Sequence, residues 1–115
     1  MRVALDYDGV ISANWSHYFQ LAFDLLKSKH SVYIITAAKH NRAQEIQSIL
    51  AAQGFHFSGI FTRPIDFIST YKNIGEWKKK IIQENAIDLW FDNEIKIYEQ
   101  AGIDFSDLKT AIVRI

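Results

Sequence analysis

Apolar runs and amphipathic stretches alternate along this chain, with polar residues between them. Short runs rich in β-branched and aromatic residues predict buried strands, whereas apolar residues recurring every three or four positions predict helices packed on one side. Strands are expected at residues 2–5, 31–35, 55–61, 87–91 and 110–115, and helices at 15–29, 40–53, 76–85 and 94–101. Gly54 and Gly102 directly follow two of these helices, where a residue with positive φ commonly ends a helix.

This order of elements predicts an α/β fold with a mainly parallel sheet. Parallel strands need long crossover connections, and each interval between these predicted strands can hold a helix or a long loop. A length of 115 residues suits a single domain, residues 1–115, of three-layer Rossmann-like architecture. Such sheets bind ligands beyond the carboxyl ends of their strands, so the residues that follow Leu5, Ile35 and Phe91 are the first candidates for a site.

Composition narrows the classes of function. Thirteen basic and thirteen acidic residues give a net charge of zero, and Lys78–Lys80 is the only compact basic run, so there is no strong signal for nucleic-acid binding. Without cysteines, disulfides and thiolate metal sites are excluded. No apolar run approaches the length of a membrane span, and an acid at position 6 interrupts any signal-peptide pattern. We therefore expect a cytoplasmic protein with no membrane partner.

Two aspartates follow the first predicted strand. In an extended segment, residues two apart point to the same side, so Asp6 and Asp8 are expected to face one space. Two carboxylates held that close need a cation or a shared proton. The alternative is a pair of solvated turn aspartates, since Gly9 lets the chain turn immediately afterwards.

A third acid, Asp92, follows the strand at 87–91. It could simply cap the helix that begins near Glu94. If the strands at 2–5 and 87–91 are neighbours, however, Asp92 joins Asp6 and Asp8 at one edge of the sheet. Three carboxylates there would form an oxygen-rich site suited to Mg²⁺.

These segments together resemble the motifs of haloacid dehalogenase (HAD) superfamily phosphatases. The run Val3–Val10, VALDYDGV, resembles the first motif, and Ile34–Thr36 resembles the second, a strand ending in Thr or Ser. A lysine ahead of the fourth strand corresponds to the third motif, and Leu89–Asn93 resembles the fourth. All four occur in the family's order and cover nearly the whole chain, which implies a HAD-like fold and a Mg²⁺-dependent phosphohydrolase.

The resemblance also implies a role for each matching residue. Asp6 would be the nucleophile that forms an aspartyl-phosphate, and Asp8 the general acid and base. Thr36, with backbone N–H groups from Ala37 onward, would bind the transferring phosphoryl group. Asp6, Asp8 (in part through its backbone carbonyl) and Asp92 would hold Mg²⁺, which together with a lysine would neutralise the developing charge.

The choice of lysine depends on spacing. In the family this residue commonly begins the helix before the fourth strand, about fourteen residues ahead of its acid, which selects Lys78. Lys72 and Lys79 remain alternatives. The chain departs from the family after Asp92: many relatives carry a second acid where this sequence has Asn93, Lys96 or Ile97, although Glu94 could substitute.

The short intervals between motifs leave no room for a cap domain, so the site is expected to be open. Open relatives often act on macromolecules or borrow a lid from another subunit, so a phosphorylated macromolecule is one possible substrate and oligomerisation is another possibility. Arg63, in the loop after the third strand, is a candidate substrate-binding residue. Trp15, His17 and His40 are further candidates for substrate contact, although Trp15 could instead be an aromatic residue that packs at the start of a helix. Rival hypotheses are an inactive HAD-like binding module and a receiver-like phosphoacceptor, the latter disfavoured because Asp6 and Asp8 share one strand.

Overall fold

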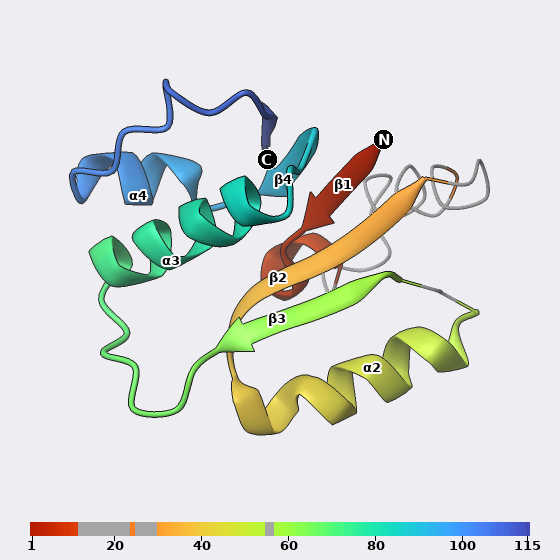
Figure 1. Cartoon of the computed structure of the whole chain (residues 1–115). Coiled ribbons are helices and arrows are strands. Elements are labelled where there is room, and N and C mark those ends of the chain that lie inside the picture. Colours follow the sequence, from red (N-terminus) through yellow and green to blue (C-terminus); the bar gives the residue numbers. More distant parts are fainter. Residues whose placement is uncertain (12–23, 25–29, 55–56) are drawn as a thin grey trace.

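The computed structural model describes residues 1–11, 24, 30–54 and 57–115, and in it five parallel strands form one sheet of order β3-β2-β1-β4-β5 (Figure 1). The strands are β1 (Arg2–Leu5), β2 (Ser31–Lys39), β3 (Gly59–Arg63), β4 (Leu89–Asp92) and β5 (Ala111–Arg114). Leu5 of the central strand pairs with Ile34 of β2 on one side and with Phe91 of β4 on the other. The predicted parallel α/β fold is confirmed, and β1 and β4 are neighbours.

Helices cover both faces of this sheet. The described helical segments are η1 (Tyr7–Ile11, a π-helical turn), η2 (His40–Arg42, a 3₁₀ turn), α2 (Ala43–Ala52), α3 (Tyr71–Glu84) and α4 (Ile95–Gln100). Helices α3 and α4 lie on one face and α2 lies on the other (Figure 1). The helix predicted at 15–29 falls almost wholly outside the described residues. None of the described helices is long and apolar enough to cross a bilayer.

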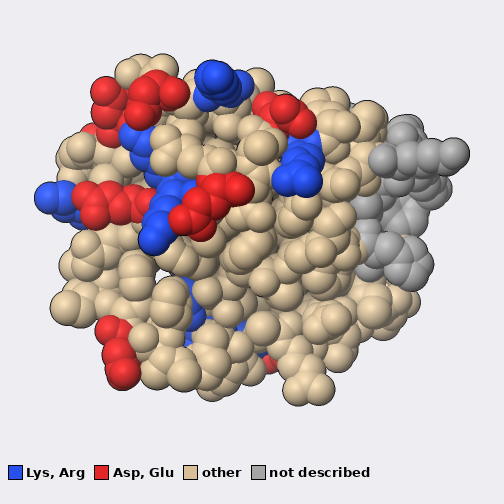
Figure 2. Space-filling model, viewed as in Figure 1, with Lys and Arg blue, Asp and Glu red and all other residues tan. Residues whose placement is uncertain are grey.

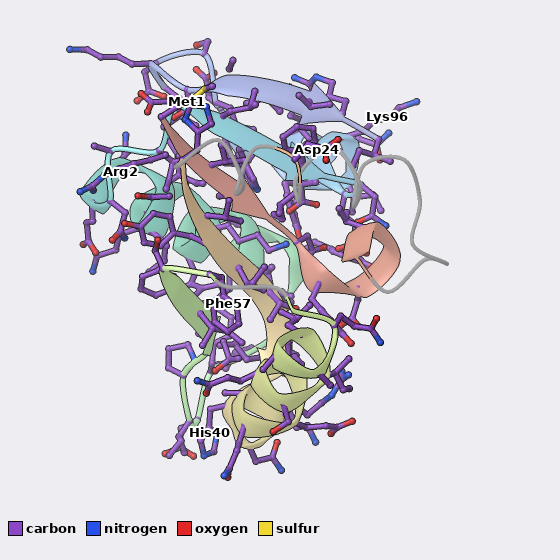
Figure 3. All side chains as sticks on the ribbon, turned by 90° about the vertical axis from the view of Figure 1, so that its right-hand side faces the viewer. Met1, Arg2, Asp24, His40, Phe57 and Lys96 are labelled. Atoms are coloured by element: carbon purple, nitrogen blue, oxygen red, sulfur yellow. The ribbon has the colours of Figure 1, made fainter. Side chains whose placement is uncertain are left out.

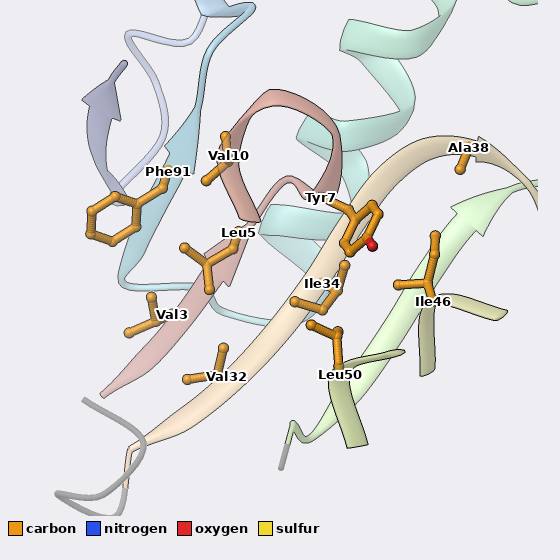
Figure 4. Packing of buried hydrophobic residues seen from close by; sticks show 10 residues of the cluster. All are labelled: Val3, Leu5, Tyr7, Val10, Val32, Ile34, Ala38, Ile46, Leu50 and Phe91. Carbon is orange, nitrogen blue, oxygen red and sulfur yellow. The ribbon is translucent and has the colours of Figure 1, made fainter. Parts of the chain in front are cut away.

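Alternation along the strands divides the buried residues into two cores. Val3, Leu5 and Phe91 pack with α2 and η1 (Figure 4), whereas Ala4 and Trp90 pack with α3 and α4. Since successive side chains in a strand point to opposite faces, each core fixes the direction of the polar residues that follow. Asp6 and Asp92, which continue the even positions of Ala4 and Trp90, are therefore expected on the side of the sheet that α3 covers.

Several boundaries differ from the sequence prediction; β3, for example, is Gly59–Arg63 rather than residues 55–61. Helix α3 begins at Tyr71 rather than near residue 76, because the Thr70 side chain accepts a hydrogen bond from the Asn73 N–H and caps the helix earlier. Strand β2 continues to Lys39, with an irregularity in its pairing with β3 between Ile35 and Lys39. The predicted helix ends at Gly54 and Gly102 are confirmed, with φ of 76° and 101°.

Candidate active site

Two buried carboxylates meet where β1 and β4 end. Asp6 follows Ala4 by two positions and Asp92 follows Trp90 by two, so both side chains point to the face covered by α3 and α4. The Asp6 N–H donates to the Phe91 carbonyl oxygen over 3.1 Å, which ties the end of β1 to β4. Asp6 is 4% exposed and Asp92 is fully buried. The predicted meeting of these two acids is confirmed.

Lys78 of α3 lies between the two acids. Its Nζ is 2.7 Å from Asp92 Oδ2 and 3.5 Å from Asp6 Oδ2, and its side chain has no exposed surface. Lys72, by contrast, is exposed. Lys79 donates to the Asp104 carbonyl oxygen and pairs with the Asp107 carboxylate. Of the three lysines considered from the sequence, the structure therefore brings only Lys78 to the carboxylates.

The charges of this Asp6–Lys78–Asp92 cluster do not balance, because one ammonium faces two carboxylates. Burial raises the pKa of Asp6 to about 7, with Lys78 opposing the rise and Asp92 adding to it. For Lys78 burial lowers the pKa, but the two carboxylates outweigh it and the net shift is upward. The cluster thus holds a permanent cation beside a carboxyl group whose protonation changes near neutral pH.

Asp8 does not share the space of Asp6, so the expectation that both acids face one side is wrong. After β1 the chain enters the helical turn η1 at Tyr7. Residues two apart in a helical turn do not point to the same side, as they do in a strand. Asp8 is exposed, and its Oδ2 lies 3.6 Å from Arg42 Nη1. The Tyr7 N–H donates to Asp6 Oδ1 over 2.9 Å.

The three-carboxylate metal site is consequently not assembled from side chains. Among the residues that the structure describes, no group of three or more histidine or acidic side chains could hold a metal ion. Asp92 is also already engaged, because its Oδ2 pairs with Lys78 and its Oδ1 accepts the Glu94 N–H over 2.8 Å. Both interpretations of Asp92 from the sequence, a start signal for the next helix and a site acid, are therefore compatible with its position.

Thr36 lies on β2, next to the end of β1. It is fully buried, and its Oγ1 accepts the Ala38 N–H over 3.3 Å. From the pairing of Leu5 with Ile34, Thr36 stands one residue beyond the level of Asp6. The irregularity of β2 starts here, and bulges beside active sites commonly re-aim backbone and side-chain groups. Half-buried Ala37 occupies the same stretch.

Arg63 lies to one side of these groups. It ends β3, which is separated from β1 by β2. With Lys39 and His40 it lines a hollow of about 270 Å³ at the carboxyl edge of the sheet. Figure 3 shows His40 at the opposite end of the sheet from Met1 and Arg2. Trp15 and His17 fall outside the described residues.

Sequence reasoning missed two neighbours of the site. Arg42 faces Asp8, and nothing but its closeness to the second motif could have suggested it. The Tyr98 ring of α4 lies under Lys78, with Nζ 5.2 Å from the ring centre, and its hydroxyl donates to Glu94 over 3.2 Å. No sequence pattern distinguishes this tyrosine from an ordinary core residue of an amphipathic helix.

Comparison with known proteins finds a shared fold. No protein-family model and no curated protein sequence matches the chain. Two solved chains resemble its structure. One belongs to a structure of the Pnkp1/Rnl/Hen1 RNA repair complex and the other to a structure of the Pnkp1/Rnl/Hen1 complex. Their TM-scores are 0.69 and 0.66, each at 12% identity and covering 99% of this chain. The chain spans 42% and 45% of their lengths, less than half in each case.

Proposed function

We propose that this domain is a HAD-type phosphohydrolase that transfers a phosphoryl group to Asp6 and then to water. One observation carries the proposal: the Asp6 carboxylate stands at the carboxyl end of the central strand beside a fully buried lysine. Lys78 is held in place by Asp92, so its charge is preorganised. A fixed cation beside a carboxylate nucleophile is the arrangement needed to stabilise charge on a transferring phosphoryl group.

The residues divide the reaction between them. An oxygen of Asp6 attacks phosphorus as the bond to the leaving oxygen breaks, which gives an aspartyl-phosphate and splits the hydrolysis into two easier steps. Asp8 gives its proton to the leaving oxygen and later takes one from the attacking water. The Asp8 side chain is 55% exposed beside Arg42, so it exchanges protons with solvent, and it would have to turn toward Asp6 to reach the leaving oxygen. Thr36 binds phosphoryl oxygens from the neighbouring strand.

The donor groups at the site suit a hard cation such as Mg²⁺. Asp6 would offer a carboxylate oxygen, and the Asp8 backbone carbonyl would be a further group that holds the ion. Asp92 would offer an oxygen once it releases Lys78 or the Glu94 N–H. A bound phosphate adds negative charge to a cluster in which Lys78 already faces two acids. Mg²⁺ would neutralise that charge, and it commonly binds through one or two carboxylates, water and substrate phosphate rather than through a complete protein cage.

The structural comparison bears on the class of substrate. The two structurally similar chains belong to assemblies, at least one of them described as an RNA repair complex. A macromolecular substrate such as a phosphorylated RNA end is therefore included in the proposal. It is compatible with a neutral protein if the contacts are local rather than spread over one basic face.

The rival proposal is a phosphate-binding module without turnover. It is favoured by Asn93, which is exposed and stands where many relatives have a second acid. It is favoured too by Asp92, both of whose oxygens are engaged. Intact Asp6, Asp8 and Lys78 oppose it.

Phosphate release distinguishes these proposals. Wild type and Asp6→Asn would be incubated with sugar phosphates, nucleotides, phosphopeptides and RNA bearing a terminal phosphate, in millimolar Mg²⁺ and in EDTA. Release of many phosphates per protein molecule, lost by about a thousandfold in Asp6→Asn, supports catalysis by the proposed nucleophile. Asp107→Asn is the matched control, since this exposed carboxylate pairs with Lys79 away from the cluster. Activity of Asp6→Asn within about tenfold of wild type, some 1.4 kcal/mol of barrier, would exclude Asp6 as the nucleophile.

A further inference from the structure

A basic hollow lies beside the proposed active site, at the ends of β2 and β3. Its walls include Lys39, His40, Asn41, Arg63 and Ser69, with a volume of about 270 Å³. In the lower part of Figure 2, Lys and Arg side chains are visible between larger areas of uncharged surface. The chemistry proposed for Asp6 does not use these residues, so it does not explain why basic side chains gather in this hollow.

The two cations of the hollow stand next to each other. Lys39 and Arg63 occupy paired positions of the parallel strands β2 and β3. Neither forms an ion pair with any residue that the structure describes. Asp66 supplies one carboxylate to the lining, which leaves an excess of positive charge. Like charges on neighbouring strands repel, and an anion bound between them would turn that repulsion into attraction.

The position of the hollow relates it to the phosphoryl site. Lys39 follows Thr36 by three residues on the same strand, which corresponds to about 10 Å along it. Both lie at the carboxyl edge of the sheet, where ligands of parallel α/β folds bind. A substrate whose scissile phosphate lies at Asp6 and Thr36 therefore extends toward Lys39 and Arg63 if it leaves the site over β2.

We infer that the hollow formed by Lys39, His40 and Arg63 binds a second phosphate group of the substrate. The inference rests on the proposed phosphohydrolase function and narrows its substrate to molecules with two phosphates about 10 Å apart or less. Arg and Lys are the side chains that recognise phosphate, and the Asn41 amide and Ser69 hydroxyl supply neutral donors. The second phosphate is either part of a small bisphosphate or the first backbone phosphodiester of an oligonucleotide that carries a terminal phosphate.

Binding to a protein without turnover tests this directly. The full chain carrying Asp6→Asn would be titrated calorimetrically with adenosine 3′,5′-bisphosphate, with adenosine 3′- and 5′-monophosphate, and with a diadenosine dinucleotide bearing a 3′-phosphate. The buffer contains millimolar Mg²⁺ and low salt, because screening weakens exposed charge contacts. At least one of the two probes with two phosphate groups should bind about 10–100-fold more tightly than the monophosphates, the range for one or two charge-assisted hydrogen bonds.

Charge-removing variants then locate the extra affinity. Lys39→Gln and Arg63→Gln, each added to Asp6→Asn, should abolish most of the preference and leave monophosphate binding unchanged. Lys109→Gln is the matched control, because this exposed lysine lines a separate hollow. That hollow also includes Asp88, which follows α3, and Thr110, which precedes β5. A preference shown by the dinucleotide alone identifies a backbone phosphodiester, and a preference shown by the bisphosphate alone identifies a small bisphosphate. A preference shared by both probes shows that the hollow accepts a second phosphate from either source.

Two results would overturn the inference. One is equal affinity for doubly and singly phosphorylated probes; the other is a preference that Lys39→Gln and Arg63→Gln reduce no more than Lys109→Gln does. Failure of the proposed function is a different observation, namely the lack of phosphate release by wild type. Thermal melts of each variant in the absence of probe confirm that it is folded, so that a lost preference reports on binding.

Discussion

Replacing Asp6 by asparagine should stabilise the metal-free protein above neutral pH and have little effect on stability in acid. The carboxyl group of Asp6 has its pKa raised from 3.8 to about 7, chiefly by burial. Between these two values the folded protein binds a proton that the unfolded chain has lost. The free energy of unfolding therefore falls as pH rises from about 4 to about 7, and then stays low. Asparagine has the shape of the protonated acid and never ionises, so Asp6→Asn escapes this loss.

The size of the effect follows from the shift. A rise of about three pKa units corresponds to about 4 kcal/mol at 1.36 kcal/mol per unit. For a domain of this size each kcal/mol changes Tm by roughly 4 °C or somewhat more, so the difference reaches on the order of 15 °C. The gain should be fully present above about pH 8 and absent near pH 4. The contact of Asp6 with Lys78 works against the gain, but burial is the larger influence on the pKa.

The assay is a series of thermal melts of wild type and Asp6→Asn from pH 4 to pH 8.5 in EDTA. The control is Asp107→Asn, whose carboxylate is 61% exposed, and its difference from wild type should not grow with pH. A constant difference between Asp6→Asn and wild type, or a wild type that is the more stable protein at pH 8, would refute the reasoning. Asp6 would then be ionised in the fold without cost, and Lys78 would be its full counterion.

Two further predictions concern the support of the site. Lys78→Met should lower the free energy of unfolding by about 3–5 kcal/mol in urea denaturation, because it leaves buried carboxylates without their cation. Lys80→Met is the control: its side chain is 72% exposed, and the substitution should change the free energy of unfolding by no more than about 0.5 kcal/mol. Gly75→Ala places a Cβ 3.0 Å from both Ile103 Cγ1 and Tyr98 Cβ, so it should cost about 1–3 kcal/mol by the same measurement, and a neutral result would show that α3 and α4 separate easily.

Much of the fold could be predicted because its signals are local. Each strand is a short apolar run, and a parallel sheet places the carboxyl ends of such runs at one edge. The proximity of Asp6 and Asp92 could therefore be predicted from the sequence. Lys78 was predicted because it precedes Asp92 by the number of residues that separates lysine and acid in the family that the chain resembles. Nothing in the sequence required its side chain to be wholly buried between the acids, since that depends on how closely α3 approaches the sheet.

The errors arose where local rules changed without a sequence signal. Asp6 and Asp8 share a side only if the strand continues, and the strand ends at Leu5. The hollow formed by Lys39 and Arg63 depends on β2 extending past Thr36 and on the register of β2 with β3, which is a tertiary property. Arg63 could be proposed from its loop, but its pairing with Lys39 could not.

Two charge imbalances of opposite sign lie side by side at the carboxyl edge of the sheet. A buried lysine between two acids is weak evidence for stability, because apolar residues of similar volume often stabilise a protein more. At the carboxyl edge lie the Asp6–Lys78–Asp92 cluster, with an extra negative charge, and the hollow, with an extra positive one. Stability does not account for two opposite imbalances side by side, whereas a phosphorylated ligand bound with a cation would compensate both.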